Sequence, residues 1–221
     1  MRTLLPPPSD HGAHRPAAQA HRLADPTGWR STAWLAGALL CAAVAGPSRS
    51  QVVAPTAKPA AACAPLLNHQ FLRLQDEVPQ SLCQYSGKVL VVVNTASFCG
   101  FTGQYAGLET LHSRYGDQGL VVLGFPSNDF SQESGSNKDI ATFCTNTFGV
   151  KFPMFVKSQV SGSGANPLYR QLAAASVRAP RWNFHKYVVG RDGKVAASFD
   201  SSVEPLDARV VQAIEKQLLV K

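Results

Sequence analysis

A run of valine and leucine, Val89–Val93, ends in small polar residues and is followed within six positions by Cys99. This run constrains the fold more than any other feature, because a strand that is apolar at every position is typical of a sheet covered on both faces. Cys99 is therefore expected on the loop between this strand and a helix. A helix N-terminus favours the reactive thiolate form of a nearby cysteine. A small buried apolar cysteine is the alternative that the run itself leaves open.

The residues after Cys99 predict a helix, a second buried strand and a loop. Apolar residues recur at helical spacing between Gln104 and Tyr115, which predicts a helix there. The apolar stretch 120–125 predicts a buried strand. The stretch 126–136 contains Pro, Ser and Gly and predicts a loop at the carboxyl end of that strand. Loops at this end of a sheet line the crevice in which α/β proteins bind ligands.

The second half of the chain predicts further helices and a hairpin. Asn137 is expected to cap a short helix that ends near Gly149. The remaining elements are a helix opened by Pro167, a hairpin over 187–199 and a last helix from about Pro205 to Leu219, with Leu206, Val210, Ile214 and Leu218 on its apolar face. This order predicts an α/β protein with a thioredoxin-like fold, in which helices flank a central mixed β-sheet.

The first 45 residues predict a signal peptide-like targeting segment. Arg30 precedes an apolar stretch, Ala33–Ala45, which is too short to span a bilayer as a stable helix. The stretch ends in small residues typical of a cleavage site, so we expect residues 1–45 to be removed on export to the periplasm or the exterior, which leaves no stable membrane span. A membrane anchor formed by an uncleaved segment is the alternative. Leu40 argues against lipid attachment at Cys41, because a small residue normally precedes a lipidated cysteine.

The rest of the chain is consistent with one domain after a linker. Residues 46–65 are rich in Pro and Ala, which favours extended backbone, and residues 66–221 are long enough for a single core. The formal net charge of the whole chain is +7. No run of Lys and Arg is interleaved with aromatic residues, so the sequence does not support a nucleic-acid partner.

The cysteines after the targeting segment are Cys63, Cys83, Cys99 and Cys144. They form no CxxC pair and no His stands at metal-ligand spacing, so neither a structural metal site nor a general thiol-disulfide oxidoreductase is favoured. Four cysteines allow three pairings, among which sequence alone does not choose. Because Cys63 and Cys83 flank one N-terminal segment, we favour a structural disulfide between them in an oxidising compartment. Two free thiols are the alternative.

Several separated motifs resemble the glutathione peroxidase family, in particular its cysteine-containing, thioredoxin-dependent bacterial members. They occur in unbroken order between about Leu66 and Leu219. The motifs are Gly87–Leu90, Asn94–Thr102, Gly124–Phe130, Gln132–Glu133, Phe143–Cys144, Phe148–Phe155 and Trp182–Phe184. The resemblance implies a thioredoxin fold and the reduction of hydrogen peroxide and organic hydroperoxides by a thiol, in response to oxidative stress.

The resemblance also implies a role for each matched residue. Cys99 takes the place of the peroxidatic residue, whose thiolate attacks the peroxide and becomes a sulfenic acid. Gln132, Trp182 and Asn183 match its catalytic neighbours, and their amide and indole groups can donate to the thiolate and to the departing oxygen. Cys144 matches the resolving cysteine, which forms a disulfide with oxidised Cys99. A cysteine on a packed helix is expected to reach Cys99 only after local unwinding.

The chain departs from the family pattern in the loop before the second helix. Ser127, Asp129, Ser131 and Ser134 replace a common Cys, Gln, Gly and Pro. The short segment between Val160 and Pro167 lacks the insertion by which tetrameric members assemble, so a monomer is expected. No prosthetic cofactor or metal is implied. The reducing partner is either a thioredoxin-like protein or glutathione.

Two functions from different classes share the same first step. The leading hypothesis is an exported thiol peroxidase that uses Cys99 and is recycled through a Cys99–Cys144 disulfide. The alternative is a redox-signalling relay that passes oxidation to a thiol of a partner protein without rapid peroxide turnover. Peroxide consumption with a small dithiol or thioredoxin distinguishes the enzyme from the relay.

Overall fold

The computed structural model describes residues 63–220. A four-stranded mixed sheet in the order β4-β3-β5-β6 forms its centre. β3 (Val89–Thr95) runs parallel to β4 (Leu120–Pro126) and antiparallel to β5 (Lys186–Val189), which forms a hairpin with β6 (Val195–Phe199). The predicted thioredoxin-like α/β fold, with a mixed sheet flanked by helices, is confirmed.

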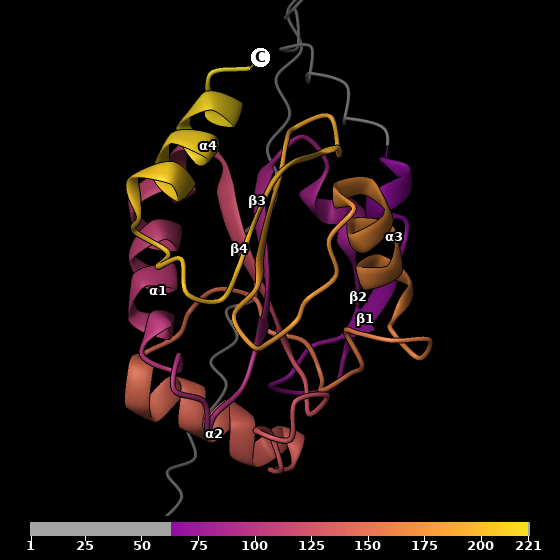
Figure 1. Ribbon diagram of the computed structural model, residues 1–221, viewed down its shortest axis with the longest axis vertical. Helices are drawn as coiled ribbons and strands as arrows, with labels where there is room; N and C mark the ends of the chain where they lie inside the picture. Colours follow the sequence, from indigo (N-terminus) through magenta and orange to yellow (C-terminus); the bar gives the residue numbers. More distant parts are fainter. Residues whose placement is uncertain (1–62, 221) are drawn as a thin grey trace, which may run out of the picture. The chain divides into compact units, whose positions relative to one another are not determined.

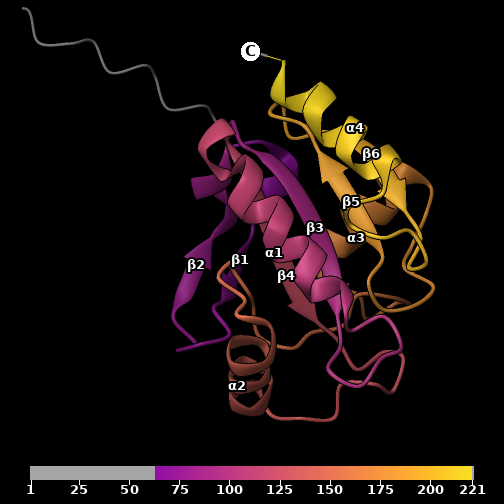
Figure 2. The ribbon, with the colours of Figure 1, turned by 90° about the vertical axis from the view of Figure 1, so that its left-hand side faces the viewer.

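Helices cover both faces of this sheet. α1 (Gln104–Tyr115) and α4 (Ala208–Leu218) lie on one face and α3 (Pro167–Ser176) lies on the other, as Figures 1 and 2 show. α2 (Asn137–Phe148) crosses below the carboxyl ends of β3 and β4 in Figure 1. No helix within residues 63–220 has the length and apolarity needed to cross a membrane.

The two faces of β3 explain its uninterrupted apolar sequence. Val89, Val91 and Val93 belong to the buried cluster that also holds the apolar side chains of α1 and α4. Leu90 and Val92 belong to a second cluster, on the α3 side. Since alternate side chains of a strand point to opposite faces, a strand between two helical layers is apolar at every position.

Two helix starts differ from those predicted. Ser136, not Asn137, caps α2, because its side chain accepts a hydrogen bond from the Asp139 N–H while the Asp139 carboxylate accepts one from the Ser136 N–H. α4 begins only after Asp207, whose side chain caps it. Leu206 therefore lies outside the helix and is 44% exposed.

A small N-terminal hairpin has no counterpart among the predicted elements. η1 (Pro65–Leu67) precedes β1 (Gln70–Leu72) and β2 (Pro79–Ser81), which pair antiparallel, and η2 (Leu82–Tyr85) follows. Both strands are three residues long and mostly exposed. Such short strands carry too few residues for a recognisable alternation of apolar and polar positions.

A disulfide joins Cys63 to Cys83 across this hairpin, with their Cα atoms 5.0 Å apart. This is the pairing that the sequence favoured. The bond ties the first described residue to η2, whose Leu82 and Tyr85 side chains are buried. Cys99 and Cys144 are the free cysteines of the described residues.

Replacing both Cys63 and Cys83 by Ser is expected to lower the free energy of unfolding by about 3 kcal/mol, because the bond closes a loop of 20 residues in the unfolded chain. Urea unfolding of the full chain, followed by circular dichroism, measures the difference. A reductant should destabilise the wild type by a similar amount and leave the variant unchanged. Equal unfolding midpoints for the oxidised wild type and the variant would contradict the prediction.

Candidate active site

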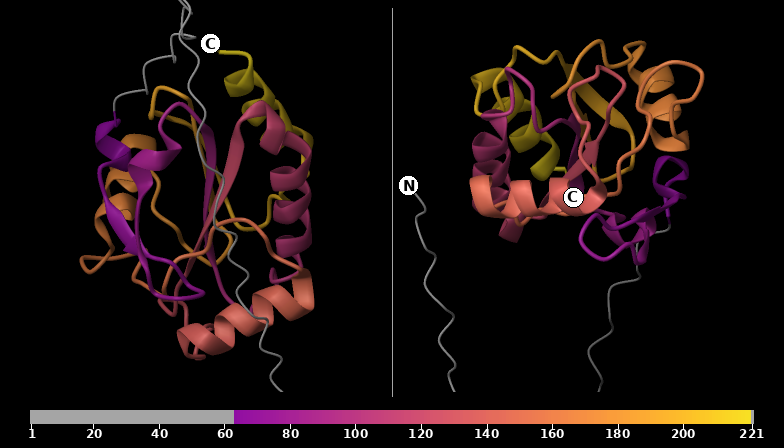
Figure 3. Two further views of the ribbon diagram at one scale, coloured as in Figure 1. Left: turned by 180° about the vertical axis from the view of Figure 1, so that it is seen from behind. Right: turned by 90° about the horizontal axis from the view of Figure 1, so that it is seen from below.

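The predicted site residues come to one edge of the sheet. β3 and β4 are parallel and end together, and β5, which is antiparallel to β3, begins at the same edge. Cys99 lies on the loop after β3, Gln132 on the loop after β4, and Trp182 and Asn183 on the segment that leads into β5. Figure 3 (right) looks onto this edge. The sheet topology thus brings together residues that lie far apart in the sequence.

Cys99 lies in a turn that is held by Thr102. The Thr102 hydroxyl accepts a hydrogen bond from the Cys99 N–H and donates one to the Ala96 carbonyl, both at 3.0 Å. The Phe101 N–H donates to Cys99 Sγ at 3.4 Å, a contact that stabilises negative charge on sulfur. α1 begins only at Gln104, so this turn, and not the first turn of the helix, supplies the N–H group that contacts the sulfur. The Cys99 residue is 9% exposed.

Gln132 is linked both to the Cys99 turn and to Asn183. Its backbone carbonyl accepts from the Phe98 N–H at 3.1 Å, and its side-chain Oε1 accepts from Asn183 Nδ2 at 3.3 Å. This bond orients the Gln132 amide so that its NH₂ group remains available to another acceptor. Ser131 before it has φ +57°, a left-handed conformation that favours glycine, which is the common residue of the family at this position.

Trp182 forms part of an apolar rim. Its ring lies 5.5 Å from that of Phe130, measured between centroids, and Trp182 is 40% exposed. Phe98, directly before Cys99, is 67% exposed. Three aromatic side chains from the three loops thus border the site, and two of them have large exposed surfaces that an apolar ligand could cover.

Asn94 holds the segment that carries Trp182 and Asn183. Its side-chain Nδ2 donates to the Trp182 carbonyl at 3.0 Å, and its Oδ1 accepts from the His185 N–H at 3.1 Å. Phe184, between them, has φ +64°, although a buried aromatic residue rarely adopts this conformation. Strained backbone of this kind persists only where surrounding contacts hold it, and it is common at functional sites.

His185 is buried behind this segment and is not part of the reacting group. Its Nε2 lies 2.8 Å from the Ser198 hydroxyl and its Nδ1 lies 3.6 Å from an Asp200 carboxylate oxygen. Burial lowers the pKa of His185 to about 4, although the charge of Asp200 opposes this effect. The imidazole is therefore neutral at pH 7 in the folded protein.

His185 should make the protein sensitive to acid. Because folding lowers its pKa from 6.5 to about 4, the unfolded chain binds the extra proton between these values, and stability is lost as pH falls through this range. The loss is expected to be of the order of 3 kcal/mol. Urea unfolding between pH 7 and pH 4 measures it, and a His185→Gln variant should have a shallower pH dependence. Identical slopes would rule out this role for His185.

Two buried polar residues of the site were not singled out by the sequence, Asn94 and Glu133. Glu133 is fully buried and its Oε2 accepts from the Ser97 hydroxyl at 3.0 Å, which ties the β4–α2 loop to the Cys99 turn. Both residues lie within the matched motifs, Asn94–Thr102 and Gln132–Glu133, but neither was assigned a role there. The available signal was a polar side chain inside or next to a buried element, since such groups need a partner in the fold.

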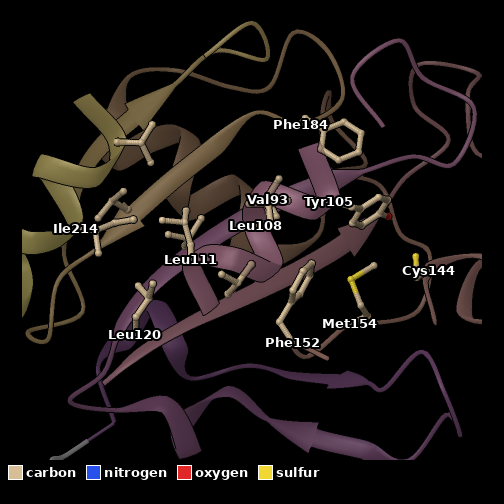
Figure 4. Packing of buried hydrophobic residues seen from close by; sticks show 14 of the residues in the cluster. Val93, Tyr105, Leu108, Leu111, Leu120, Cys144, Phe152, Met154, Phe184 and Ile214 are labelled. Carbon is tan, nitrogen blue, oxygen red and sulfur yellow. The ribbon is translucent and has the colours of Figure 1, made fainter. Parts of the chain in front are cut away.

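Cys144 lies on the inner face of α2 and is 2% exposed. It belongs to the same buried cluster as Cys99, and Figure 4 shows its sulfur near the side chains of Tyr105 and Met154. Burial, with a smaller contribution from the negative charge of Glu133, raises the pKa of the Cys144 thiol to about 11, although the Tyr105 hydroxyl opposes this effect. The thiol is thus protonated at neutral pH in this conformation.

The reacting groups gathered at this edge are two free thiols with amide, indole and backbone N–H donors. Within residues 63–220, no group of three or more His, Cys, Asp or Glu side chains is placed to hold a metal ion. A free thiol on the loop after the first long strand, with polar side chains on the neighbouring loops, is typical of thiol-dependent oxidoreductases of the thioredoxin fold.

Comparison with known proteins narrows this class. A family model described as glutathione peroxidase matches residues 69–173. The hydroperoxy fatty acid reductase gpx1 of Synechocystis sp. is 45% identical over 154 residues, which cover 65% of this chain and 90% of the relative. The thioredoxin/glutathione peroxidase BtuE of Escherichia coli is 42% identical over 163 residues, which cover 62% of this chain and 89% of the relative. The crystal structure of Trgpx in apo form matches with a TM-score of 0.55 and 33% sequence identity. The match covers 69% of this chain and 95% of the Trgpx chain.

The chain belongs to the glutathione peroxidase family. It is a thiol peroxidase, an oxidoreductase that acts on a peroxide as acceptor. The resemblance stated from the sequence motifs is confirmed.

Proposed function

We propose that Cys99 reduces hydrogen peroxide and organic hydroperoxides to water and alcohols. The Cys99 thiolate attacks the peroxide bond, becomes a sulfenic acid and releases water or an alcohol. The observation that carries this proposal is the convergence at one sheet edge of Cys99, Gln132, Trp182 and Asn183, with the Gln132–Asn183 hydrogen bond linking two of the loops. Amide and indole donors there can stabilise negative charge on the thiolate and on the leaving oxygen.

Cys144 is the proposed resolving residue. Its thiol would attack oxidised Cys99 to form a disulfide, and a reductant would then restore both thiols. Its membership in the same buried cluster as Cys99 supports this role. Since Cys144 is on the packed face of a helix, α2 must unwind locally for the two sulfur atoms to meet.

A thioredoxin-like protein is the proposed reductant, and glutathione is the alternative. A protein dithiol reduces an internal disulfide in one exchange reaction, which suits a Cys99–Cys144 cycle. Both donors occur in the name of the E. coli relative. For the peroxide, the exposed surfaces of Phe98 and Trp182 favour hydroperoxides with an apolar tail, consistent with the name of the Synechocystis relative.

Export is supported by the Cys63–Cys83 disulfide, because such bonds persist in oxidising compartments. We therefore keep the division into a targeting segment (1–45), a linker (46–65) and a peroxidase domain (66–221), and propose a periplasmic or secreted monomer. The first two segments lie outside the described residues, apart from the last residues of the linker. Retention by an uncleaved N-terminal anchor is the alternative, and separating soluble from membrane fractions, with the mass of the recovered protein, would distinguish the two.

The signalling relay is retained as a second function because Cys144 is buried and protonated, so an outside thiol could reach oxidised Cys99 first. The test is to mix the reduced full chain with one equivalent of hydrogen peroxide or linoleic acid hydroperoxide, quench at intervals, and map the disulfides by mass spectrometry. Rapid oxidation followed by a Cys99–Cys144 bond supports the peroxidase cycle. Rapid oxidation that stalls until a protein thiol is added supports the relay, and sluggish oxidation of Cys99 would refute both.

A further inference from the structure

Lys186, the first residue of β5, is a fully buried lysine at the sheet edge that carries the site. Lysine is rarely buried, because its ammonium group then loses its hydration, and a buried lysine normally keeps a carboxylate as partner. The ion pairs formed within residues 63–220 do not include Lys186. A salt bridge therefore does not explain why this side chain is buried.

The ammonium group of Lys186 joins two segments of the site. Its Nζ donates to the Phe184 backbone carbonyl at 2.6 Å and to Gln104 Oε1 at 2.7 Å. Phe184 directly follows Asn183, and Gln104 is the first residue of α1, the helix that follows the Cys99 turn. One side chain thus bonds both to the segment that leads into β5 and to the helix that continues from the Cys99 turn.

Gln104 is itself held by three further hydrogen bonds. Its Nε2 donates to the Ser201 carbonyl at 2.7 Å and to Glu204 Oε1 at 3.3 Å, and its backbone N–H donates to the Phe101 carbonyl at 2.9 Å. Gln104 is only 3% exposed. Because its NH₂ group and its backbone are both bonded, the amide presents its oxygen to Lys186 in one orientation.

The Phe184 carbonyl belongs to the strained part of the segment. Phe184 has φ +64°, and its ring lies 5.3 Å from that of Tyr105 between centroids, inside the buried cluster shown in Figure 4. The Phe184 N–H donates to the Asn94 carbonyl at 2.6 Å, while the Phe184 carbonyl accepts from Lys186. Strained backbone persists only where contacts hold it, so loss of the lysine should allow this segment to relax.

The two bonds of Lys186 do not depend on its ionisation. Burial lowers its pKa to about 8, although the charges of Glu204 and Asp200 oppose this effect. The side chain is thus mainly protonated at neutral pH, and a neutral amine would still have an N–H group for each of the two acceptors. The role that the geometry supports is one of position.

We propose that Lys186 is a positioning residue that holds the Trp182–Asn183 segment in place relative to the Cys99 turn, so that the donors of this segment meet the oxygen that leaves the peroxide. The proposal rests on the proposed function of these residues. Asn183 Nδ2 donates to Gln132 Oε1 at 3.3 Å, so displacement of the segment would also release the Gln132 amide. Lys186 itself transfers no proton and forms no bond to the peroxide in this role.

The test is Lys186→Met in the full chain, which keeps the length of the side chain but removes its donor. Quenched flow and mass spectrometry of Cys99 measure two rates of the reduced protein, oxidation by one equivalent of hydrogen peroxide and alkylation by iodoacetamide. Oxidation needs a donor for the leaving oxygen, whereas alkylation releases iodide and needs none. Oxidation is expected to slow by about 100-fold, while alkylation stays close to the wild-type rate.

Trp182 reports directly on the position of the segment. With Trp29→Phe and Trp34→Phe in the full chain, Trp182 is the only tryptophan. Its fluorescence anisotropy should fall in Lys186→Met, because the segment is released. Lys194→Met is the matched control, since it removes the same charge from an 85% exposed side chain after β5 and should change neither rate.

Unaltered oxidation in a folded Lys186→Met protein would overturn the proposal. Equal slowing of oxidation and alkylation would also overturn it, because the lysine would then act on the thiol itself, and so would slow oxidation with unchanged Trp182 anisotropy. If Lys186→Met does not fold, Gln104→Met removes the side-chain acceptor of the lysine and should slow oxidation alone by about tenfold; wild-type oxidation in that variant would reject the role. A wild type whose Cys99 is alkylated readily but oxidised sluggishly would refute the peroxidase function, and this inference with it.

Discussion

A Cys99→Ser variant should lose peroxide turnover by at least about a thousandfold, with any thiol as reductant. A serine hydroxyl is protonated at neutral pH and cannot be oxidised by a peroxide to a sulfenic acid equivalent, so the first step of the cycle disappears. The fold should persist, because Ser is close in size to Cys and the turn depends on Thr102, whose bonds go to backbone atoms of Cys99 and Ala96. Peroxide consumption by the full chain with a thioredoxin system, or with glutathione, measures the loss.

Cys41→Ser provides the matched control for this experiment. It makes the same chemical change within residues 1–45, for which we propose a targeting role, and should leave peroxide consumption unaltered. Circular dichroism and the unfolding midpoint establish that Cys99→Ser has folded. Substantial turnover in a folded Cys99→Ser protein would move the peroxidatic role to another residue.

The strands and helices near Cys99 could be predicted because each has a strong local pattern. β3 is apolar at every position and is bordered by turn-forming residues, and α1 has apolar residues at helical spacing. The start of α4 could not be placed, because Leu206 continues the i, i+4 spacing although the Asp207 cap begins the helix after it. The hairpin of β1 and β2 is stabilised by tertiary contacts and the disulfide, which local patterns do not encode.

The grouping of Cys99, Gln132 and Asn183 followed from motif resemblance and not from local pattern. Their proximity depends on the parallel pairing of β3 with β4 and the antiparallel entry of β5. The contributions of Asn94 and Glu133 could be identified only in the folded structure. Each side chain acts through a hydrogen bond to a residue on another loop, and the sequence does not show this partner. The burial of Cys144 agrees with the packed helix that the sequence predicted, whereas its position near Tyr105 became visible only in the structure.

The burial of Cys144 makes its replacement the most informative change after Cys99. In Cys144→Ser, the first equivalent of peroxide should be consumed as in the wild type, since the Cys99 turn and its hydrogen bonds are separate from α2. Oxidised Cys99 then has no internal partner, so turnover with a thioredoxin system is expected to fall by about 100-fold. Further peroxide should convert Cys99 to the sulfinic acid. Dimedone labelling and mass spectrometry follow these species.

The choice of reductant decides how this variant is interpreted. Glutathione can attack the Cys99 sulfenic acid directly, so turnover with glutathione should survive in Cys144→Ser even though turnover with thioredoxin is lost. We expect this difference because a protein dithiol such as thioredoxin acts by exchange with a disulfide. If Cys144→Ser turns over normally with thioredoxin, Cys144 is a buried helix residue and an external thiol resolves Cys99. Loss with both reductants, in a protein that still consumes the first equivalent, would instead show that small thiols do not reach Cys99.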